Sequence, residues 1–202
     1  YVQFSDQTIT FVSPTIYNWN ILADNQSIDF NPISDKLIFD AAGISAAVIS
    51  ITQPTAGSTS IYYNGKTVVL QVELATLTPA NFAFSGGGSV LIGDNTTGSI
   101  NDDSANAIYD TPNADYILGL GGNDSIYVSG GNDKINGGDG EATVIFQSPY
   151  AASTIVKNAN GTTTVTSTLN GSDILTNVEF AQFADRTVSL LSPGVSASTN
   201  PP

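Results

Sequence analysis

The apolar positions of this chain follow two different patterns. In residues 1–92 they form short apolar or alternating runs, which predict β-strands. Turn-forming dipeptides separate these runs, and Asn64-Gly65 lies between SIYY and KTVVLQV, a strong hairpin signal. Only residues 74–83 have a weak helix-like pattern. We therefore expect residues 1–92 to form a β-rich N-terminal region.

In residues 93–145, Gly, Asn and Asp dominate and the apolar residues become sparse but regular. One apolar residue recurs every nine positions, at Ile108, Ile117, Ile126, Ile135 and Val144. The positions two residues before these are held by Asn106, Asp115, Asp124, Asp133 and Ala142. Nine residues is not a helical period, and strand alternation alone would not keep an Asp in register with an Ile. The pattern indicates an internal repeat.

A parallel β-roll accounts for this period. Each nonapeptide would form a six-residue loop and a three-residue strand whose central residue points inward. Stacked turns would then bury the Ile and Val column at a spacing of about 4.8 Å. Glycines permit the tight loops, and loop carbonyls with a carboxylate would surround one cavity. Such a cavity suits a hard cation with oxygen ligands, and calcium fits it better than magnesium does.

These residues also resemble a known family. The stretch GGNDSIYVSGGNDKINGGDGEATV resembles the nonapeptide G-G-x-G-x-D-x-U-x of the repeats-in-toxin (RTX) family. The resemblance is most specific over residues 110–145 and weaker over 93–109, and SDILTNVEFAQFADRTVSL resembles the strand segment that often follows such rolls. It implies a calcium-binding bacterial protein that is exported in one step as an unfolded chain. Calcium would then drive its folding at an extracellular or cell-surface location.

The resemblance also assigns calcium ligands by position. Asp115, Asp124 and Asp133 match the ligating Asp of the repeat. Loops two nonapeptides apart would share an ion, which pairs Asp115 with Asp133 on one side of the roll. On the other side Asp124 would face the 137–142 loop, where Ala142 replaces the Asp and weakens the site.

The remaining ligands follow from the same comparison, and we expect two to four ions. Asn106 stands in for Asp in the 101–106 loop that also faces Asp124. The other candidate ligands are Gly119, Gly121, Gly130, Asn132 and Gly137, through backbone carbonyls, and Asp139. A flexible linker rich in Gly and Asn is the alternative, but a linker has no reason to keep Ile and Asp in register. For Asp29, Asp35 and Asp40 we expect turn residues, with a separate calcium site as the alternative.

Residues 146–192 return to β-character, and residues 193–202 predict a tail or linker. The first of these segments would form a C-terminal β-cap that closes the open end of the roll, since an uncovered last turn would expose an edge. The sequence therefore predicts an all-β fold: a short parallel β-roll with calcium-binding loops, flanked by an N-terminal β-rich region and a C-terminal β-cap.

Composition narrows the function. The 202 residues carry a net charge of −13 with only five basic residues, which disfavours nucleic-acid binding. Most of the 18 acids are Asp, the short carboxylate favoured in turns and calcium loops. His and Cys are absent, which excludes His- and Cys-based catalysis inside this chain, and we expect no enzyme activity from it. No run of 18 apolar residues exists, so we expect no transmembrane segment.

Two segments far apart in the chain are similar to each other. Residues 3–14 (QFSDQTITFVSP) and 182–193 (QFADRTVSLLSP) share six of twelve positions. One strand motif used twice would explain this. So would a strand donated between subunits, or a tandem array with units of roughly 180 residues.

Two main functional hypotheses remain open at this point, and glycan binding through calcium is a weaker third. The first is a secreted structural or adhesive module of a large adhesin, surface-layer or filament protein. Such a module would fold on binding calcium and contact neighbouring repeats or copies of itself. The second is an accessory calcium-binding module of a secreted hydrolase or polysaccharide-modifying enzyme.

Overall fold

The computed structural model describes residues 2–3, 8–9, 13–93 and 104–191, and it confirms the predicted all-β fold with a parallel β-roll. Its helical residues are short 3-10 turns only. Two of them, η3 (Leu74–Thr76) and η4 (Pro79–Asn81), occupy the segment with the weak helix-like pattern. The predicted tail, 193–202, lies outside the described residues.

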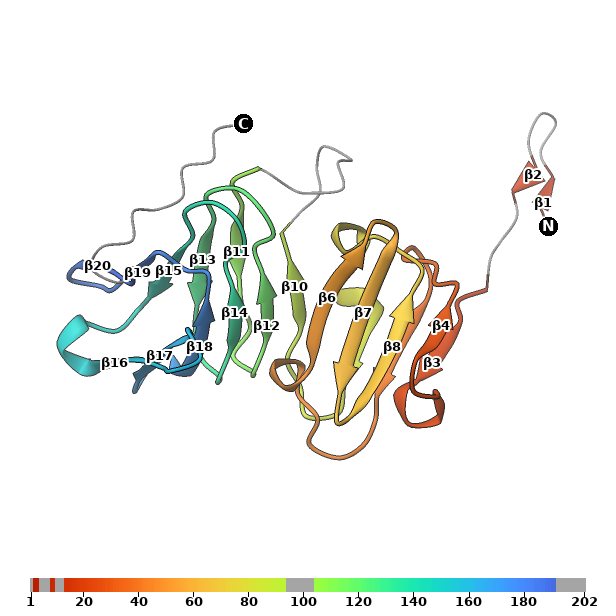
Figure 1. The fold of residues 1–202 in the computed structure, drawn as a ribbon, viewed down its shortest axis with the longest axis horizontal. Coiled ribbons are helices and arrows are strands. Elements are labelled where there is room, and N and C mark those ends of the chain that lie inside the picture. Colours follow the sequence, from red (N-terminus) through yellow and green to blue (C-terminus); the bar gives the residue numbers. More distant parts are fainter. Residues whose placement is uncertain (1, 4–7, 10–12, 94–103, 192–202) are drawn as a thin grey trace.

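Two sheets form the roll, and the chain alternates between them (Figure 1). The first sheet contains, in spatial order, β10 (Val90–Ile92), β12 (Tyr116–Leu118), β14 (Lys134–Asn136), β18 (Gly171–Thr176), β17 (Thr163–Ser167) and β16 (Ser153–Lys157). The second contains β11 (Ala107–Tyr109), β13 (Ser125–Val128), β15 (Thr143–Phe146), β19 (Phe180–Gln182) and β20 (Thr187–Ser189). Repeats two nonapeptides apart pair in parallel and in register, as predicted, because Ile117 lies beside Ile135 and Ile126 beside Val144.

The inward column fills the centre of the roll. Ile117, Ile126, Ile135 and Val144 are all fully buried. Full burial of such side chains stabilises a fold by roughly 1.5–3 kcal/mol each. The column continues past residue 145 into the segment predicted as a cap, because β18 pairs with β14 and β19 with β15, both in parallel. The cap therefore adds one more turn to the roll, and the β16–β17 hairpin is inserted before that turn.

The N-terminal region is also built from two alternating sheets, which its irregular spacing did not predict. In one sheet β3 (Ile16–Asn18), β5 (Lys36–Phe39) and β9 (Phe82–Phe84) run parallel. In the other, β4 (Gln26–Ile28) is parallel to β8 (Lys66–Leu70), which continues antiparallel into β7 (Ser58–Tyr63) and β6 (Ser50–Thr55). The hairpin signal at Asn64-Gly65 is confirmed by the β7–β8 connection. Both halves thus insert an antiparallel pair before a strand that rejoins a parallel sheet.

The first sheet of the roll is a wall between two apolar cores, and Figure 1 shows the two halves side by side along it. Tyr116 and Leu118 pack into the N-terminal core, whereas Ile117 between them faces the core of the roll. The predicted boundary at residue 92 falls directly after β10, which belongs to this wall. Lys134 fastens the halves together, because its Nζ donates to the Ile49 carbonyl at 2.8 Å and lies 4.4 Å from the ring centroid of Tyr116.

The two similar segments have the same backbone pairing. The strands β1 (Val2–Gln3) and β2 (Thr8–Ile9) form a two-stranded antiparallel sheet in which Gln3 lies opposite Thr8. In β19–β20, Gln182 lies opposite Thr187, so each pair is repeated 179 positions later in the same register.

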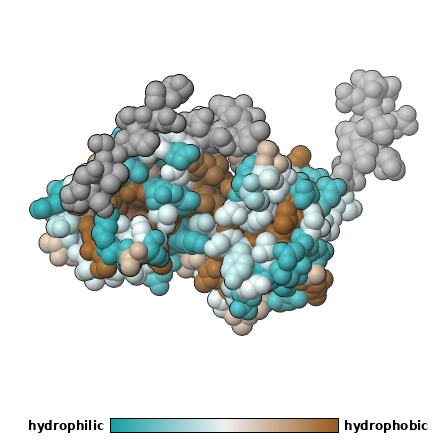
Figure 2. Space-filling model, viewed as in Figure 1, coloured by the Kyte–Doolittle hydropathy of each residue, from teal (hydrophilic) through white to brown (hydrophobic). Residues whose placement is uncertain are grey.

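The surface is mixed in polarity. Figure 2 shows apolar patches interspersed among hydrophilic ones on the face it presents. Large apolar side chains such as Ile21 and Ile33 stand exposed in the N-terminal half. Within the described ranges, none of the helical segments has the length and hydropathy of a membrane-spanning helix.

Candidate metal centre

A column of buried aspartates runs along one edge of the roll. Asp115, Asp133 and Asp173 are each at most 1% exposed, and each lies two residues before an inward residue of the first sheet. Each carboxylate accepts a backbone N–H from the neighbouring turn. Asp133 Oδ1 accepts the Asp115 N–H at 2.9 Å, and Asp173 Oδ1 accepts the Asp133 N–H at 3.0 Å. This bond between turns explains why Asp stays in register with the inward residue.

The Asn that precedes the Asp in the GGND motif accepts a backbone N–H from the turn on the other side. Asn132 Oδ1 accepts the N–H of Ser172 at 2.9 Å, and Asn123 Oδ1 accepts the N–H of Glu141 at 2.9 Å. Asn therefore bonds to the following turn, whereas Asp bonds to the preceding one. In this structure the side chain of Asn132 connects two turns, and a carbonyl ligand role for Asn132 stays a prediction.

The loops approach each other closely at one glycine position. Gly131 has φ +117° and Gly171 has φ +83°. A Cβ on Gly131 would lie 2.4 Å from the Asn113 carbonyl oxygen, and a Cβ on Gly171 only 1.6 Å from the Gly131 oxygen. Only glycine fits between such closely stacked loops. The stacking in turn keeps the carboxylates of neighbouring turns close together.

Three acids meet at this edge. Carboxylate oxygens of Asp110, Asp115 and Asp133 lie within 4.8 Å of one another. Asp110 was not among the predicted ligands, because it stands in the repeat position that Gly119 and Gly137 hold elsewhere. Its Oδ2 accepts the Ser129 N–H at 2.8 Å, which directs the carboxylate toward the loop of the next turn.

Not all of these oxygens have a protein donor. Asp115 Oδ2 accepts the Thr111 N–H at 2.8 Å, but Oδ2 of Asp133 and of Asp173 is buried without a hydrogen-bond partner. Burial raises the pKa of Asp133 to about 9. The charges of Asp173, Asp110 and Asp115 also raise this pKa, whereas the hydrogen bond from the Asp115 N–H lowers it. Burial likewise raises the pKa of Asp173 to about 7.

These buried oxygens fit a hard divalent cation. An ionised carboxylate without a partner in the interior is strongly unfavourable, and a nearby cation removes that penalty. Carboxylate and carbonyl oxygens are the ligands that calcium prefers, whereas nitrogen and sulfur ligands from His and Cys do not exist in this sequence. When bound, calcium would supply the positive charge that the column lacks, and Asp110, Asp115 and Asp133 would hold it.

Asp35 in the N-terminal half occupies the position equivalent to that of the column aspartates, but both of its carboxylate oxygens accept hydrogen bonds from the protein. It lies two residues before the inward Leu37, and its Oδ1 accepts the N–H of Thr15 at 2.9 Å, the same bond between turns. Its Oδ2, however, accepts the N–H of Asn31 at 3.0 Å. Burial acts to raise the pKa of Asp35, but these hydrogen bonds outweigh it and the pKa is lowered.

Asp35 is therefore satisfied by the protein itself, which supports the interpretation as a turn residue. The other two acids of that segment, Asp29 and Asp40, are exposed. Asp40 accepts hydrogen bonds from the side-chain amides of Asn18 and Asn20. In the part of the chain that the structure describes, these acids form no cluster suited to a metal ion.

The opposite edge of the roll carries fewer buried acids, since among its described residues only Asp124 is a buried acid. Asp124 Oδ1 accepts the N–H of Asn106 at 2.9 Å. One turn further, where Ala142 replaces the Asp, the Ala142 N–H donates to Glu179 Oε2 at 2.7 Å. Burial raises the pKa of Glu179. Residues 101–103 of the loop predicted to face Asp124 lie outside the described residues.

The glycines of this edge bring further oxygens together. A Cβ on Gly119 would lie 2.3 Å from the Gly137 carbonyl oxygen and 2.4 Å from Asp124 Oδ2. The Asp124 carboxylate and the Gly137 carbonyl therefore converge, as a shared ion would require. The structure does not test that ion, so it stays a prediction.

The remaining predicted ligands take different places. Gly121 and Asp139 form an isolated parallel bridge, but the Asp139 side chain is exposed. Gly130 lies between stacked loops, where its Cβ would be 3.8 Å from the Leu169 oxygen and 3.9 Å from the Pro112 oxygen.

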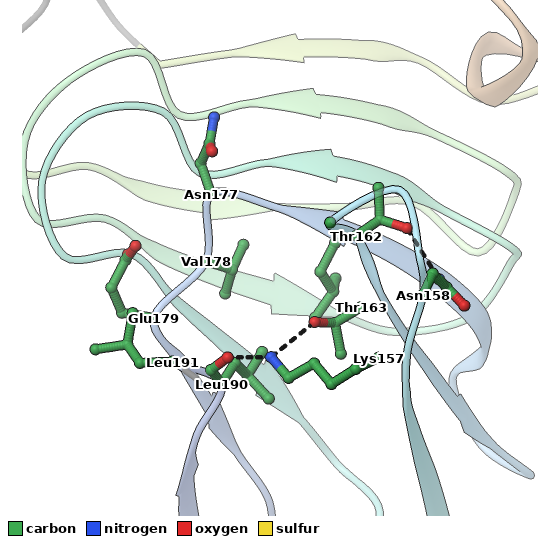
Figure 3. Close-up of a pocket in the computed structure, with 11 residues that line it drawn as sticks. Lys157, Asn158, Thr162, Thr163, Asn177, Val178, Glu179, Leu190 and Leu191 are labelled. Atoms are coloured by element: carbon green, nitrogen blue, oxygen red, sulfur yellow. Dashed lines mark hydrogen bonds between the residues drawn. The ribbon is translucent and has the colours of Figure 1, made fainter. Parts of the chain in front are cut away.

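A pocket of about 320 Å³ lies at the far end of the roll, between the β16–β17 turn and residues 175–191 (Figure 3). Lys157 Nζ donates to Thr163 Oγ1 at 3.0 Å and to the carbonyl of Leu190. Glu179 is the one acid among the residues that line it, and none of the column aspartates reaches it. The metal centre and this pocket are therefore separate features.

Comparison with known proteins agrees with this geometry. Residues 109–144 match the family model HemolysinCabind, the RTX calcium-binding nonapeptide repeat, in four copies. No curated protein matches the chain. Asp110, Asp115, Asp124 and Asp133 lie inside the matched segment, whereas Asp173 and Glu179 lie beyond it. The sequence did contain a signal for Asp173, because Gly171, Asp173 and Leu175 repeat the spacing of Gly131, Asp133 and Ile135. Residues 109–144 are thus RTX nonapeptide repeats, and the chain carries a calcium-binding module that is folded as a parallel β-roll.

Proposed function

We propose that this chain is a structural module of a secreted extracellular protein, and that its roll folds when calcium is present. The observation that carries the proposal is the pair of buried carboxylate oxygens, on Asp133 and Asp173, that no protein group satisfies. Where calcium is scarce, ionisation of these two carboxyl groups opposes folding. At roughly millimolar calcium, one site with a Kd of roughly 10⁻⁴ M contributes about 1.4 kcal/mol. Folding would then follow export.

The proposed module has a scaffolding or adhesive role, as a unit of a tandem array in an adhesin, surface-layer or filament protein. The matching registers of β1–β2 and β19–β20, 179 positions apart, support a unit that recurs. The lack of His and Cys supports a role without catalysis in this chain. Contacts between units would join the modules end to end.

Light scattering and circular dichroism, in EGTA and then in millimolar calcium, test this proposal. We expect calcium to increase the β-signal and to produce large regular assemblies. A folded monomer in calcium would contradict self-association and favour the accessory module of a secreted enzyme. No calcium response in either measurement would refute calcium-dependent folding.

A further inference from the structure

We infer that a calcium ion also binds between Asp133 and Asp173, at a site that joins the C-terminal cap to the roll and lies beyond the RTX repeats. The inference rests on the proposed calcium-dependent folding, and it adds a ligand residue and a second function of the ion. The repeats end at residue 144, so neither the family match nor the nine-residue period includes Asp173.

After the inserted β16–β17 hairpin, the chain rejoins the first sheet of the roll and forms a loop like that before β14. Successive column aspartates Asp115 and Asp133 are 18 residues apart, whereas Asp173 follows Asp133 by 40. The β16–β17 hairpin lies within that longer interval. Nevertheless β18 pairs with β14 so that Leu175 lies beside Ile135. Gly171, like Gly131, has a positive φ, and the two glycines are in close contact.

Both carboxylates are buried, and they belong to neighbouring turns of the roll. Asp133 is 1% and Asp173 is 0% exposed, and the hydrogen bond from the Asp133 N–H fixes Asp173 Oδ1 against the neighbouring turn. The Oδ2 atoms of both residues are enclosed without any donor. Two neighbouring buried carboxylates repel each other, and a divalent cation with oxygen ligands relieves both the repulsion and the missing contacts.

The surrounding polar groups are already occupied, which isolates these two oxygens. The side-chain amide of Asn170 donates to the carbonyls of Val128 at 2.8 Å and Ser129 at 3.0 Å. Its Oδ1 accepts the hydroxyl of Ser148 at 3.0 Å. This buried network aligns the returning chain on the 128–133 loop, but it supplies no donor to either Oδ2. An ion bound here would therefore contact the two Oδ2 atoms that the protein leaves without a donor.

Such a site makes the cap depend on calcium. It would hold β18, and with it the β16–β17 hairpin, against β14. Calcium would then fix the end of the roll as well as its repeats, and the hairpin would loosen when calcium is removed.

The substitution Asp173→Asn tests the inference, with Asp29→Asn, at an exposed acid of the N-terminal half, as the matched control. Asn keeps one oxygen for the Asp133 N–H and removes the charge. Isothermal titration with calcium should count one ion fewer in D173N, while D29N keeps the wild-type number. Hydrogen exchange in millimolar calcium should become faster in residues 153–176 of D173N.

A second measurement separates an ion site from a structural role. In EGTA, D173N should melt at the wild-type temperature or above it, because a neutral amide replaces a buried carboxyl group that ionises only at a cost in stability. A lower melting temperature in EGTA would assign Asp173 a structural role and overturn the inference. An unchanged ion count in D173N would also overturn it, while leaving the proposed function intact. Wild-type protein that binds no calcium would refute both.

Discussion

At the scale of single residues, Asp35 and Asp133 show how one position can be satisfied in two ways. Both lie two residues before an inward strand residue, and both accept a backbone N–H from the preceding turn at 2.9 Å. The second oxygen of Asp35 accepts the N–H of Asn31, whereas that of Asp133 has no donor. The protein itself stabilises the first charge, whereas the second charge is unfavourable unless a cation lies nearby.

The lowered pKa of Asp35 predicts a pH-dependent contribution to stability. A depressed pKa means that ionised Asp35 favours the folded state, so its contribution is present above the unfolded value of about 3.9 and is lost as pH falls through the folded pKa. Urea unfolding should show Asp35→Asn less stable than wild type by about 1–3 kcal/mol near pH 6. The difference should shrink below about pH 4. Trp19, the single Trp, is buried in the N-terminal core and reports this transition by fluorescence. A difference that stays constant with pH would contradict the assignment.

The stacked loops predict unequal tolerance of two glycines with similar backbone angles. A Cβ on Gly161 (φ +87°) would have nothing within 4 Å, whereas a Cβ on Gly171 (φ +83°) would lie 1.6 Å from the Gly131 oxygen. Gly161→Ala should cost about 1 kcal/mol, from backbone strain alone. Gly171→Ala should cost about 3 kcal/mol or more, because two loops must separate. Equal losses in thermal unfolding with calcium would show that the loops do not stack so closely.

At the scale of elements, the regular repeat was predictable and the interrupted one was not. The nine-residue period placed Ile117 beside Ile135 and Ile126 beside Val144, because every turn contributes the same length. The nine-residue period did not identify Asp173 as a candidate ligand, because a hairpin is inserted before it. It did not identify Asp110, because this residue stands at a position that glycine holds in other repeats. The parallel pairing of strands in the N-terminal half was not predicted either, because an inserted segment also interrupts the spacing there. Leu37 and Phe82 pair directly, yet a three-stranded antiparallel segment separates them in sequence.

The aspartate column also predicts that calcium displaces protons. Burial raises the pKa of Asp173 to about 7 and that of Asp133 to about 9. The metal-free fold therefore holds protons that the unfolded chain has lost, and its stability falls as pH rises from about 4 through these values. Calcium affinity should rise over the same range, and binding near pH 7 should release protons.

Titration calorimetry in two buffers with different ionisation enthalpies measures this release. Asp173→Asn should release fewer protons than wild type, whereas Asp29→Asn should match it. Identical apparent enthalpies in both buffers would contradict the predicted proton release.

At the scale of the whole molecule, the two halves share a wall but differ in what stabilises them. The N-terminal half uses protein donors for its buried acid, and the roll has buried carboxylates that lack them. In chelator, hydrogen exchange should therefore leave β5 and β8 more protected than β14 and β18. Calcium should narrow that difference. Equal loss of protection in both halves would indicate that the wall makes them unfold as one unit.

The shared wall also bears on how the molecule would respond to being stretched. Tension on the N-terminal half would have to break hydrogen bonds and apolar contacts that the chain supplies itself. Tension on the roll would have to separate turns that ions hold together, so its resistance would follow the salt composition of the surroundings. A filament of such modules would thus alternate stretches of fixed strength with stretches whose strength the environment sets.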